Sequence, residues 1–351
     1  ALIAGARRSL RLAFYIFAPD SSGARVRDAL VDAARRGVDV SVLLDGFGAA
    51  ADARYFAPLT DAGGRFACFI AKPGIRYLIR NHQKMVIADN RIAMLGGFNI
   101  EDSYFAGPED NGWSDLGFTV EGPVVAHVSD WFCQLEEWTA DPKAQFRSIR
   151  RRVRRWDAGR EPVQLLIGGP TRGLSSWARR ISIDLLNAER LDIMMAYFSP
   201  SRRLSKRIAA IARKGKTRLV LAGKTDNGAT IGASRSLYRR LLRAGAKIYE
   251  FQPCKLHTKL IVLDDTVYIG SANFDLRSLY LNLEIVLAVE DAALAEKMRG
   301  FIADHLPASR EITPELHERQ ATFWNRLRWS LSWFLVSAVD YTVTRKLNLG
   351  L

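Results

Sequence analysis

Two histidine–lysine pairs carry the residue types best suited to chemistry. His82 is followed two positions later by Lys84, and His257 is followed in the same way by Lys259. Alternate side chains of a strand leave the same face, so each spacing predicts an imidazole beside an ammonium group. Histidine can act as a nucleophile, an acid or a base near pH 7. The pairs therefore indicate a site for nucleophilic or acid–base chemistry.

An asparagine follows the first pair across a predicted turn. Asp89 and Asn90 end an apolar run and lead into a segment that contains Gly97 and Asn99. A two-residue hairpin turn would place His82 opposite Gly97 and keep Asn99 on the same face. The glycine would then leave room for a ligand beneath the converging side chains.

The second pair has the same surroundings with one difference in length. Asp264, Ser271 and Asn273 repeat the pattern, but the stretch from Asp264 to Gly270 is one residue shorter than the one that ends at Gly96. A bulge or an altered turn must absorb that difference. Ser271 either serves the chemistry or only caps a turn, because its counterpart has no hydroxyl. The aspartate of each copy is interpreted as a structural turn residue that bonds local backbone.

Two stretches of the chain repeat one order of elements, namely an apolar strand, a helix that ends at a glycine, and a second strand. Their ranges are 10–17, 26–37 and 38–44 in the first half, and 191–198, 204–215 and 218–221 in the second. Four short sequence matches link the halves in the same order, at offsets of about 175 to 182 residues. These matches predict an internal duplication of an α/β unit with parallel strands.

The charge balance narrows the class of partner. The 351 residues carry a net charge of +14 and a sequence pI near 9.9, which favours nucleic acid, an anionic membrane or phosphorylated substrates as partners.

The three cysteines lie far apart, so they predict no disulfide framework or zinc site and favour a reducing compartment. The longest apolar stretch near the C-terminus has eleven residues, fewer than the ~20 that a membrane span needs. The chain starts at Ala1 rather than at a methionine, which leaves room for an upstream segment with an anchor.

Two further segments have compositions typical of anionic surfaces. An arginine run at 147–155, which includes Arg151 and Arg152, is either a solvated linker or helix face, or a contact with acidic lipid. Near the C-terminus Trp324, Trp329 and Trp333 fall in a segment of helical spacing with basic flanks. That segment predicts either an interfacial helix or a helix docked on the body of the protein.

The extended motif HxKxxxxD, followed by Gly-Gly or Gly-Ser and an asparagine, resembles the signature of the phospholipase D superfamily. The chain carries it twice, as His82, Lys84, Asp89, Gly97 and Asn99, and as His257, Lys259, Asp264, Ser271 and Asn273. More narrowly, the segments at 113–115, 121–123, 270–278 and 282–284 look like the bacterial cardiolipin synthase branch. The resemblance extends to about residue 305.

The resemblance implies two tandem phospholipase D-like α/β sandwich domains, each a mixed sheet flanked by helices, related by pseudo-twofold symmetry. The expected boundaries are 1–145 for the first domain, 146–162 for a basic linker, 163–305 for the second domain and 306–351 for an amphipathic tail. The remaining histidines, His127, His305 and His317, lack the motif and are interpreted as structural or surface residues.

The resemblance also implies phosphodiester exchange. His82 is expected to attack phosphorus and form a phosphohistidine, with His257 as the acid and base. Lys84, Lys259, Asn99 and Asn273 would stabilise charge on the non-bridging oxygens. Asp115 and Glu284 follow their histidines by 33 and 27 residues, and are expected to orient those rings. No metal or other cofactor is required for this chemistry.

These expectations favour a phosphatidyltransferase that makes cardiolipin from phosphatidylglycerol and a second lipid alcohol. Water as the acceptor would make the protein a phospholipase D, and a superfamily nuclease is the rival class. The expected partners are an anionic phospholipid membrane and glycerophospholipid substrates, while the flanking segments and the aromatic tail disfavour nucleic acid. The expected location is peripheral, on the cytoplasmic face of the cytoplasmic membrane.

Overall fold

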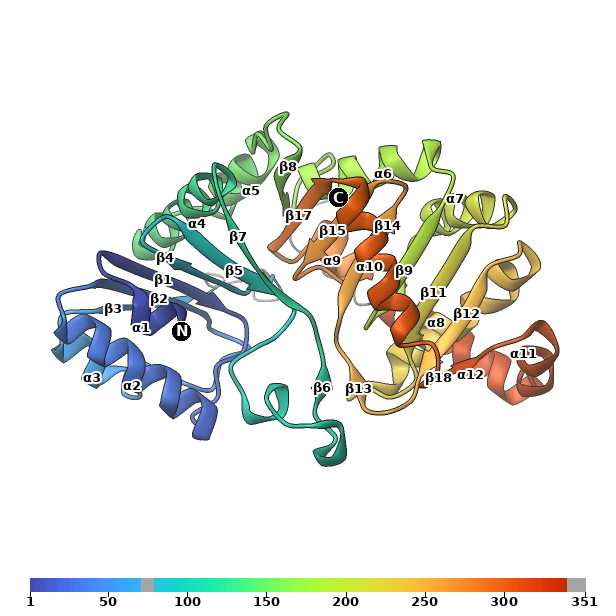
Figure 1. Cartoon of the computed structure of the whole chain (residues 1–351), viewed down its shortest axis with the longest axis horizontal. Helices are drawn as coiled ribbons and strands as arrows, with labels where there is room; N and C mark the ends of the chain where they lie inside the picture. The colour runs from blue at the N-terminus through green and yellow to red at the C-terminus, as the bar shows by residue number, and fades with distance from the viewer. Residues whose placement is uncertain (71–78, 340–351) are drawn as a thin grey trace.

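A computed structural model describes residues 1–70 and 79–339 and contains two mixed sheets, each flanked by helices (Figure 1). The first sheet has the strand order β3-β2-β1-β4-β5-β7. Its strands are β1 (Ser9–Phe14), β2 (Asp39–Asp45), β3 (Arg65–Phe69), β4 (Met85–Ala88), β5 (Ile92–Gly96) and β7 (Gly117–Glu121). The predicted α/β class is confirmed.

The second sheet repeats this order and adds one strand at each edge, giving β18-β12-β11-β9-β14-β15-β17-β8. Its strands are β8 (Val163–Gly168), β9 (Leu191–Met195), β11 (Thr217–Ala222), β12 (Lys247–Phe251), β14 (Lys259–Leu263), β15 (Thr266–Gly270), β17 (Glu284–Glu290) and β18 (Ser309–Glu311). In both sheets the first strand of the repeat pairs in parallel with the strand that follows the next helix, β2 or β11, and antiparallel with the hairpin that carries the histidine motif. The predicted duplication is therefore present in the strand pairing.

Helices cover both sheets and join them through one core. The first half has α1 (Leu2–Gly5), α2 (Ser21–Arg35) and α3 (Ala57–Asp61), and the second has α6 (Ser176–Asn187), α7 (Arg202–Ala212) and α8 (Gly228–Arg243). Between them α4 (Val124–Ala140), α5 (Phe146–Arg155) and α10 (Ala292–Asp304) contribute buried side chains to a cluster that also takes residues from both sheets. The apolar core is thus continuous across the two halves.

The two hairpins that follow the histidine motifs close differently. Ala88 pairs with Ile92, which leaves a three-residue turn, whereas Leu263 pairs with Thr266 around a two-residue turn. The altered turn absorbs the length difference that the sequence indicated. The predicted register in the first half is wrong by one residue, because Met85 pairs with Leu95, whereas a two-residue turn would pair it with the preceding methionine.

The motif aspartates occupy the turns in the left-handed region, with φ of 55° for Asp89 and 48° for Asp264. The Asp89 carboxylate accepts backbone N–H bonds from residues 7–9, and that of Asp264 accepts them from residues 189 and 190. The expected bonds to local backbone are not what the structure shows, because the backbone partners lie 74 to 82 residues away in the chain. Each carboxylate ties its hairpin to the start of the adjacent antiparallel strand, β1 for Asp89 and β9 for Asp264.

The basic run forms α5 and has a buried side. Phe146, Ile149 and Val153 face the core, so these residues form a docked helix rather than an extended linker. Arg151 is exposed, and the Arg152 guanidinium lies 3.4 Å from the carboxylate of Glu137. The domain boundaries expected on either side of this run stay predictions.

The tail begins as an added edge strand, β18, which pairs antiparallel with β12. It continues as α11 (Pro314–Gln320) and α12 (Phe323–Trp333), and α12 packs against α8. Residues 345 and 346, which contribute to the predicted basic flank, lie outside the described residues. Within the described ranges, no helix combines the length and the apolar composition needed to cross a bilayer.

Candidate active site

The two histidine motifs meet where short segments of one half pair with the other. Strand β13 (Lys255–Leu256) pairs with β6 (Trp113–Ser114), and Asn81 forms an isolated bridge with Leu283. The two histidine backbones make matching bonds across this junction. His82 donates its N–H to the Leu283 carbonyl at 3.0 Å, and His257 donates to the Ser114 carbonyl at 2.7 Å. Such reciprocal contacts are typical of a twofold arrangement.

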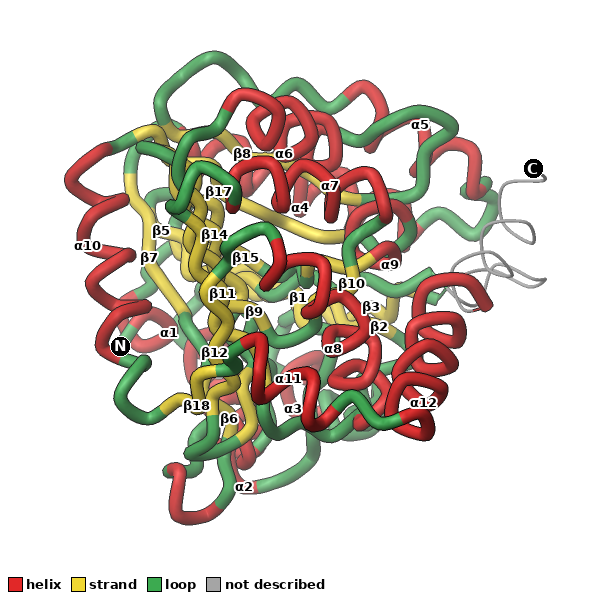
Figure 2. Tube along the Cα trace, turned by 90° about the vertical axis from the view of Figure 1, so that its right-hand side faces the viewer, coloured by secondary structure: helices red, strands yellow, loops and turns green. Residues whose placement is uncertain are grey.

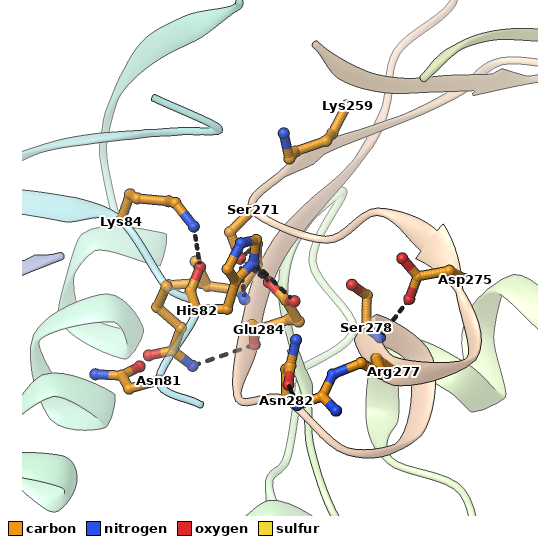
Figure 3. Close-up of polar contacts among 12 residues, drawn as sticks. Asn81, His82, Lys84, Lys259, Ser271, Asp275, Arg277, Ser278, Asn282 and Glu284 are labelled. Atoms are coloured by element: carbon orange, nitrogen blue, oxygen red, sulfur yellow. Dashed lines mark hydrogen bonds and ion pairs between the residues drawn. The ribbon is translucent and has the colours of Figure 1, made fainter. Parts of the chain in front are cut away.

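The orienting carboxylates are exchanged between the halves. The Nδ1 atom of His82 lies 3.0 Å from Oε2 of Glu284, and Nδ1 of His257 lies 2.6 Å from Oδ2 of Asp115 (Figure 3 shows the first pair). The prediction that each carboxylate orients the histidine preceding it in sequence is therefore wrong. The chain places each carboxylate one strand beyond its own hairpin, at the junction, where the nearest imidazole belongs to the opposite half.

Each carboxylate is supported differently by its own half. A Cβ atom at Gly97 would lie 2.6 Å from Oδ1 of Asp115, so the missing side chain makes room for this carboxylate rather than for a ligand. At the matching position the Ser271 hydroxyl donates to Oε2 of Glu284 and accepts the Ile285 N–H at 3.1 Å. Ser271 therefore holds a carboxylate in place and does not cap a turn.

Both motif lysines are buried beside their histidines. The Nζ atom of Lys84 donates to the His82 carbonyl at 2.6 Å, and Lys259 donates to the carbonyl of His257. Burial lowers the pKa of Lys84 to about 7 and that of Lys259 to about 8. Each ammonium group would gain from an anion bound nearby, because an opposite charge favours the charged form.

The motif asparagines are buried at the same place. Asn99 accepts the Ile16 N–H through Oδ1 at 3.0 Å and donates through Nδ2 to the Tyr104 hydroxyl at 2.9 Å. Asn273 is also buried, and its Oδ1 has no hydrogen-bond partner among the described residues. The two halves thus hold their amides by different contacts.

Burial keeps both imidazoles uncharged. Desolvation, followed by the charge of the neighbouring lysine, lowers the pKa of His82 well below its ordinary value. The same causes lower the pKa of His257 to about 4. Burial also raises the pKa of Glu284 to about 8. An uncharged imidazole whose Nδ1 faces a carboxyl group leaves Nε2 as the atom available to a substrate.

A cavity of about 510 Å³ contains the two histidines and the two asparagines. Its wall also includes side chains that the motifs did not indicate. The Tyr104 hydroxyl lies 3.5 Å from Nε2 of His257, the Trp113 ring packs edge-on against the same imidazole, and Tyr15 packs against His82. Trp113 belongs to the segment 113–115 noted in the sequence, but no sequence spacing marks Tyr15 or Tyr104.

Two arginines line the cavity on the His82 side. The guanidinium of Arg80 lies over the Phe47 ring, with 3.4 Å between its Cζ atom and the ring centroid. Arg277, on α9 (Leu276–Tyr280), donates to Oδ1 of Asn282 at 3.4 Å, and Figure 3 shows it below His82 and Glu284. Burial, with a contribution from Arg277, lowers the pKa of Arg80. Arg80 lies two residues before His82 in the sequence, which could have drawn attention to it.

The other histidines lie outside this cavity. His317 stacks on Trp329, His305 bonds the Phe301 carbonyl through Nδ1, and His127 packs edge-on against Trp156. In the part of the chain that the structure describes, no group of three or more His, Cys, Asp or Glu side chains is arranged to hold a metal ion.

The predicted membrane-binding tryptophans have three different environments. Trp329 is 4% exposed and stacks on His317, so it docks α12 on the protein and its assignment to a membrane surface is wrong. Trp324 is 74% exposed. Trp333 is half-buried, with the guanidinium of Arg202 5.6 Å from its ring centroid.

Comparison with known proteins gives consistent results. The family model described as "Cardiolipin synthase, PLD-like domain" matches residues 1–135 and 183–305. Cardiolipin synthase A of Pectobacterium carotovorum is 29% identical, over 94% of this chain and 70% of the relative. Cardiolipin synthase B of Salmonella typhimurium is 30% identical, over 92% of this chain and 80% of the relative.

Solved structures share the fold at low sequence identity. The phosphatidylserine synthase of Haemophilus influenzae superposes with a TM-score of 0.74 at 17% identity, covering 98% of this chain and 91% of that one. The polyphosphate kinase of Porphyromonas gingivalis superposes with a TM-score of 0.61 at 18% identity, covering 90% of this chain and 46% of that one. The fold thus occurs in proteins with different names.

Proposed function

This chain belongs to the cardiolipin synthase family with a phospholipase D-like domain, and from that premise we propose that it is a phosphatidyltransferase that makes cardiolipin. The donor is phosphatidylglycerol, and the acceptor is the terminal hydroxyl of a second lipid alcohol. The observation that carries the proposal is the pair of buried imidazoles in one cavity, each with Nδ1 facing a carboxyl group of the opposite half.

In the first step Nε2 of His82 attacks the phosphorus of the donor. A P–N bond forms, and the P–O bond to the headgroup glycerol breaks with its electron pair on the glycerol oxygen. The negatively charged phosphate of the bound donor favours the protonated form of His257, which then donates the proton that this oxygen takes up and so acts as the general acid. The products are a phosphatidyl-histidine and free glycerol.

In the second step His257 removes the proton of the acceptor hydroxyl. The acceptor oxygen attacks phosphorus, a P–O bond forms, and the P–N bond to His82 breaks. Two in-line displacements give net retention of configuration at phosphorus. Cardiolipin leaves, and both histidines return to their starting state.

Lys84, Lys259, Asn99 and Asn273 bind the non-bridging oxygens of the phosphoryl group. Preorganised donors act most strongly on charge that develops in a buried site. The lysine pKa values of about 7 and about 8 in the free protein rise when the phosphate binds, so substrate binding increases the positive charge around phosphorus.

Arg80 and Arg277 favour an acceptor that carries its own phosphate. Both guanidinium groups line the cavity on the side of the nucleophile, and Arg side chains recognise phosphate through paired hydrogen bonds. Water and glycerol lack an anionic group for this region. The arginines therefore support transfer to a second phospholipid over hydrolysis.

The enzyme works as a peripheral protein on an anionic membrane, at its cytoplasmic face. The exposed apolar side chains of α12 and the exposed arginines of α5 support this attachment. Figure 2 shows α5, α9 and α12 toward the same side of the molecule, and α9 carries cavity residues. Lipids could then reach the cavity from the surface to which the protein binds.

Incubation of the purified protein with phosphatidylglycerol vesicles tests the proposal. The expected products, read by mass spectrometry, are cardiolipin and one glycerol for each cardiolipin formed. Phosphatidic acid as the main product would instead assign hydrolysis. Absence of both products, with a protein that sediments with the vesicles and unfolds cooperatively, would overturn the proposed reaction.

A further inference from the structure

A basic groove lies beside α12 and is separate from the catalytic cavity. It has a volume of about 640 Å³, and α7, α8 and α12 form its walls. None of its lining residues belongs to the catalytic cavity. Its lining contains no carboxylate and includes Trp333 and five arginines, namely Arg202, Arg213, Arg239, Arg240 and Arg243.

Most of this positive charge has no counterion among the residues that the structure describes. Arg239 forms an ion pair with Glu318 at 3.1 Å. Among the described residues, none forms an ion pair with Arg202, Arg213, Arg240 or Arg243. Like charges gathered around one groove repel each other, and a bound anion would reverse that repulsion.

An apolar face adjoins the groove on the same helix. Trp329 docks α12 on the body, while Phe323, Trp324, Leu327 and Leu331 are all more than half exposed. At 3.6 residues per turn these four side chains lie on the face opposite Trp329. Ser330 and Trp333 line the groove between the docked and exposed faces. A cationic recess therefore borders an apolar surface.

We propose that the groove binds the phosphate headgroup of an anionic phospholipid whose acyl chains lie along the exposed face of α12. Guanidinium groups bind phosphate through paired, charge-assisted hydrogen bonds. A helix with an apolar face and adjacent cationic side chains is typical of proteins that lie in the membrane interface. The inference extends the membrane attachment proposed above and assigns it to a specific site.

The apolar face decides between lipid and nucleic acid as the anion. Arginines alone would suit either, because both present phosphates. Of the four exposed apolar side chains next to the groove, Leu327 and Leu331 have no ring on which a base can stack, whereas all four match the chains of a lipid bound by its headgroup. The site therefore fits a membrane lipid.

The test compares two triple variants of the full chain that lose the same charge. The groove variant is Arg213→Gln with Arg240→Gln and Arg243→Gln. The control is Arg54→Gln with Arg91→Gln and Arg160→Gln, which are all exposed and do not line the groove. Co-sedimentation is measured with phosphatidylcholine vesicles that contain or lack phosphatidylglycerol, and thermal melts establish that each variant folds.

The groove variant should bind the anionic vesicles on the order of 100-fold more weakly than the wild type, because each arginine near an anionic surface contributes roughly a factor of 5. The control should lose less than about 10-fold. Equal losses in the two variants would overturn the inference in favour of diffuse surface charge. Unchanged vesicle binding by the groove variant, with lost binding to a DNA oligonucleotide, would also overturn it.

The same proteins separate this inference from the proposed reaction. His82→Ala should retain vesicle binding and lose cardiolipin synthesis. If the wild type makes no cardiolipin but the groove variant still loses vesicle binding, the lipid site stands without the proposed function. If the wild type makes cardiolipin and the groove variant binds vesicles as tightly as the control, the reaction stands and the lipid site does not.

Discussion

The two half-sites share a plan and differ in their surroundings. In the first, His82 faces Glu284, and the nearby cavity wall includes Arg80 and Tyr15. In the second, His257 faces Asp115, with aromatic rings packed around the imidazole. Duplication supplied the same backbone twice, and the side chains around each histidine then diverged. The difference suits a division of labour, in which one imidazole attacks phosphorus and the other moves protons.

Replacing either histidine should have the largest effect. His82→Ala and His257→Ala should each reduce turnover by roughly 10⁴-fold or more, and the double variant should lose little further activity, because both act in one sequence of steps. Product formation from phosphatidylglycerol measures the losses.

Trapping the covalent phosphatidyl-histidine intermediate tests which of the two histidines is the nucleophile. The covalent phosphatidyl group should be found on the peptide that contains His82. An adduct on His257 in the wild type would reverse the assigned roles, and fully additive losses in the double variant would contradict a shared mechanism.

Substitutions of the two carboxylates that face the histidines should have the second-largest effect on activity. Glu284→Gln and Asp115→Asn keep the shape of the side chain but replace the carboxyl group that faces Nδ1 by an amide, whose NH2 group can hold the imidazole in the wrong tautomer, which should lower kcat by about 10² to 10⁴-fold. Because the partners are exchanged, Glu284→Gln should slow formation of the adduct on His82, and Asp115→Asn should change proton transfer by His257. Single-turnover adduct formation and the pH profile of kcat distinguish them. The opposite pattern would show that each carboxylate serves its own half.

The sequence predicted the duplicated α/β units and, through the two motifs, the two histidines and two asparagines that line the cavity. It could not predict the exchange of Asp115 and Glu284, because linear spacing says nothing about which half a strand end meets. Tyr104 was missed because it lies in a short 3₁₀ segment of an irregular loop, where no periodicity marks a functional side chain. The sequence also could not predict which face of α12 is buried, because helical spacing does not tell which apolar side packs against the protein.

Substitutions at Gly97 and Ser271, which position the two carboxylates, should have smaller and unequal effects on kcat. Gly97→Ala places a Cβ atom within 2.6 Å of Asp115, so it should displace that carboxylate and lower kcat by about 10-fold to 100-fold. Ser271→Gly removes one hydrogen bond to Glu284, which His82 still contacts, and should lower kcat by only about 10-fold. Steady-state kinetics beside thermal melts measure both. A greater loss for Ser271→Gly would mean that the hydroxyl contacts the substrate.

Lowering the pH should reduce the free energy of unfolding, because the His257 imidazole is buried. The pKa of His257 is about 4 in the folded protein and about 6.5 when unfolded, so the unfolded chain takes up the proton first as the pH falls. Stability is lost between those values, by about 1.4 kcal/mol between pH 7.5 and pH 5.5.

His257→Gln cannot take up this proton. Over the same pH interval its melting temperature should fall by ~2–4 °C less than that of the wild type. Thermal melts of both proteins at the two pH values measure the difference. Parallel falls in wild type and variant would mean that this ring titrates as an exposed imidazole does.

The exchanged carboxylates make the polypeptide between the halves part of the catalyst. Each imidazole is oriented only when the other half is docked, so the covalent connection sets the effective concentration at which the two half-sites find each other. A chain cut between α4 and α5 would thus act as a pair of binding partners, with activity that depends on the concentration of both pieces. Assembly of the active site then depends more on the affinity of one sheet for the other than on the number of residues between the two motifs.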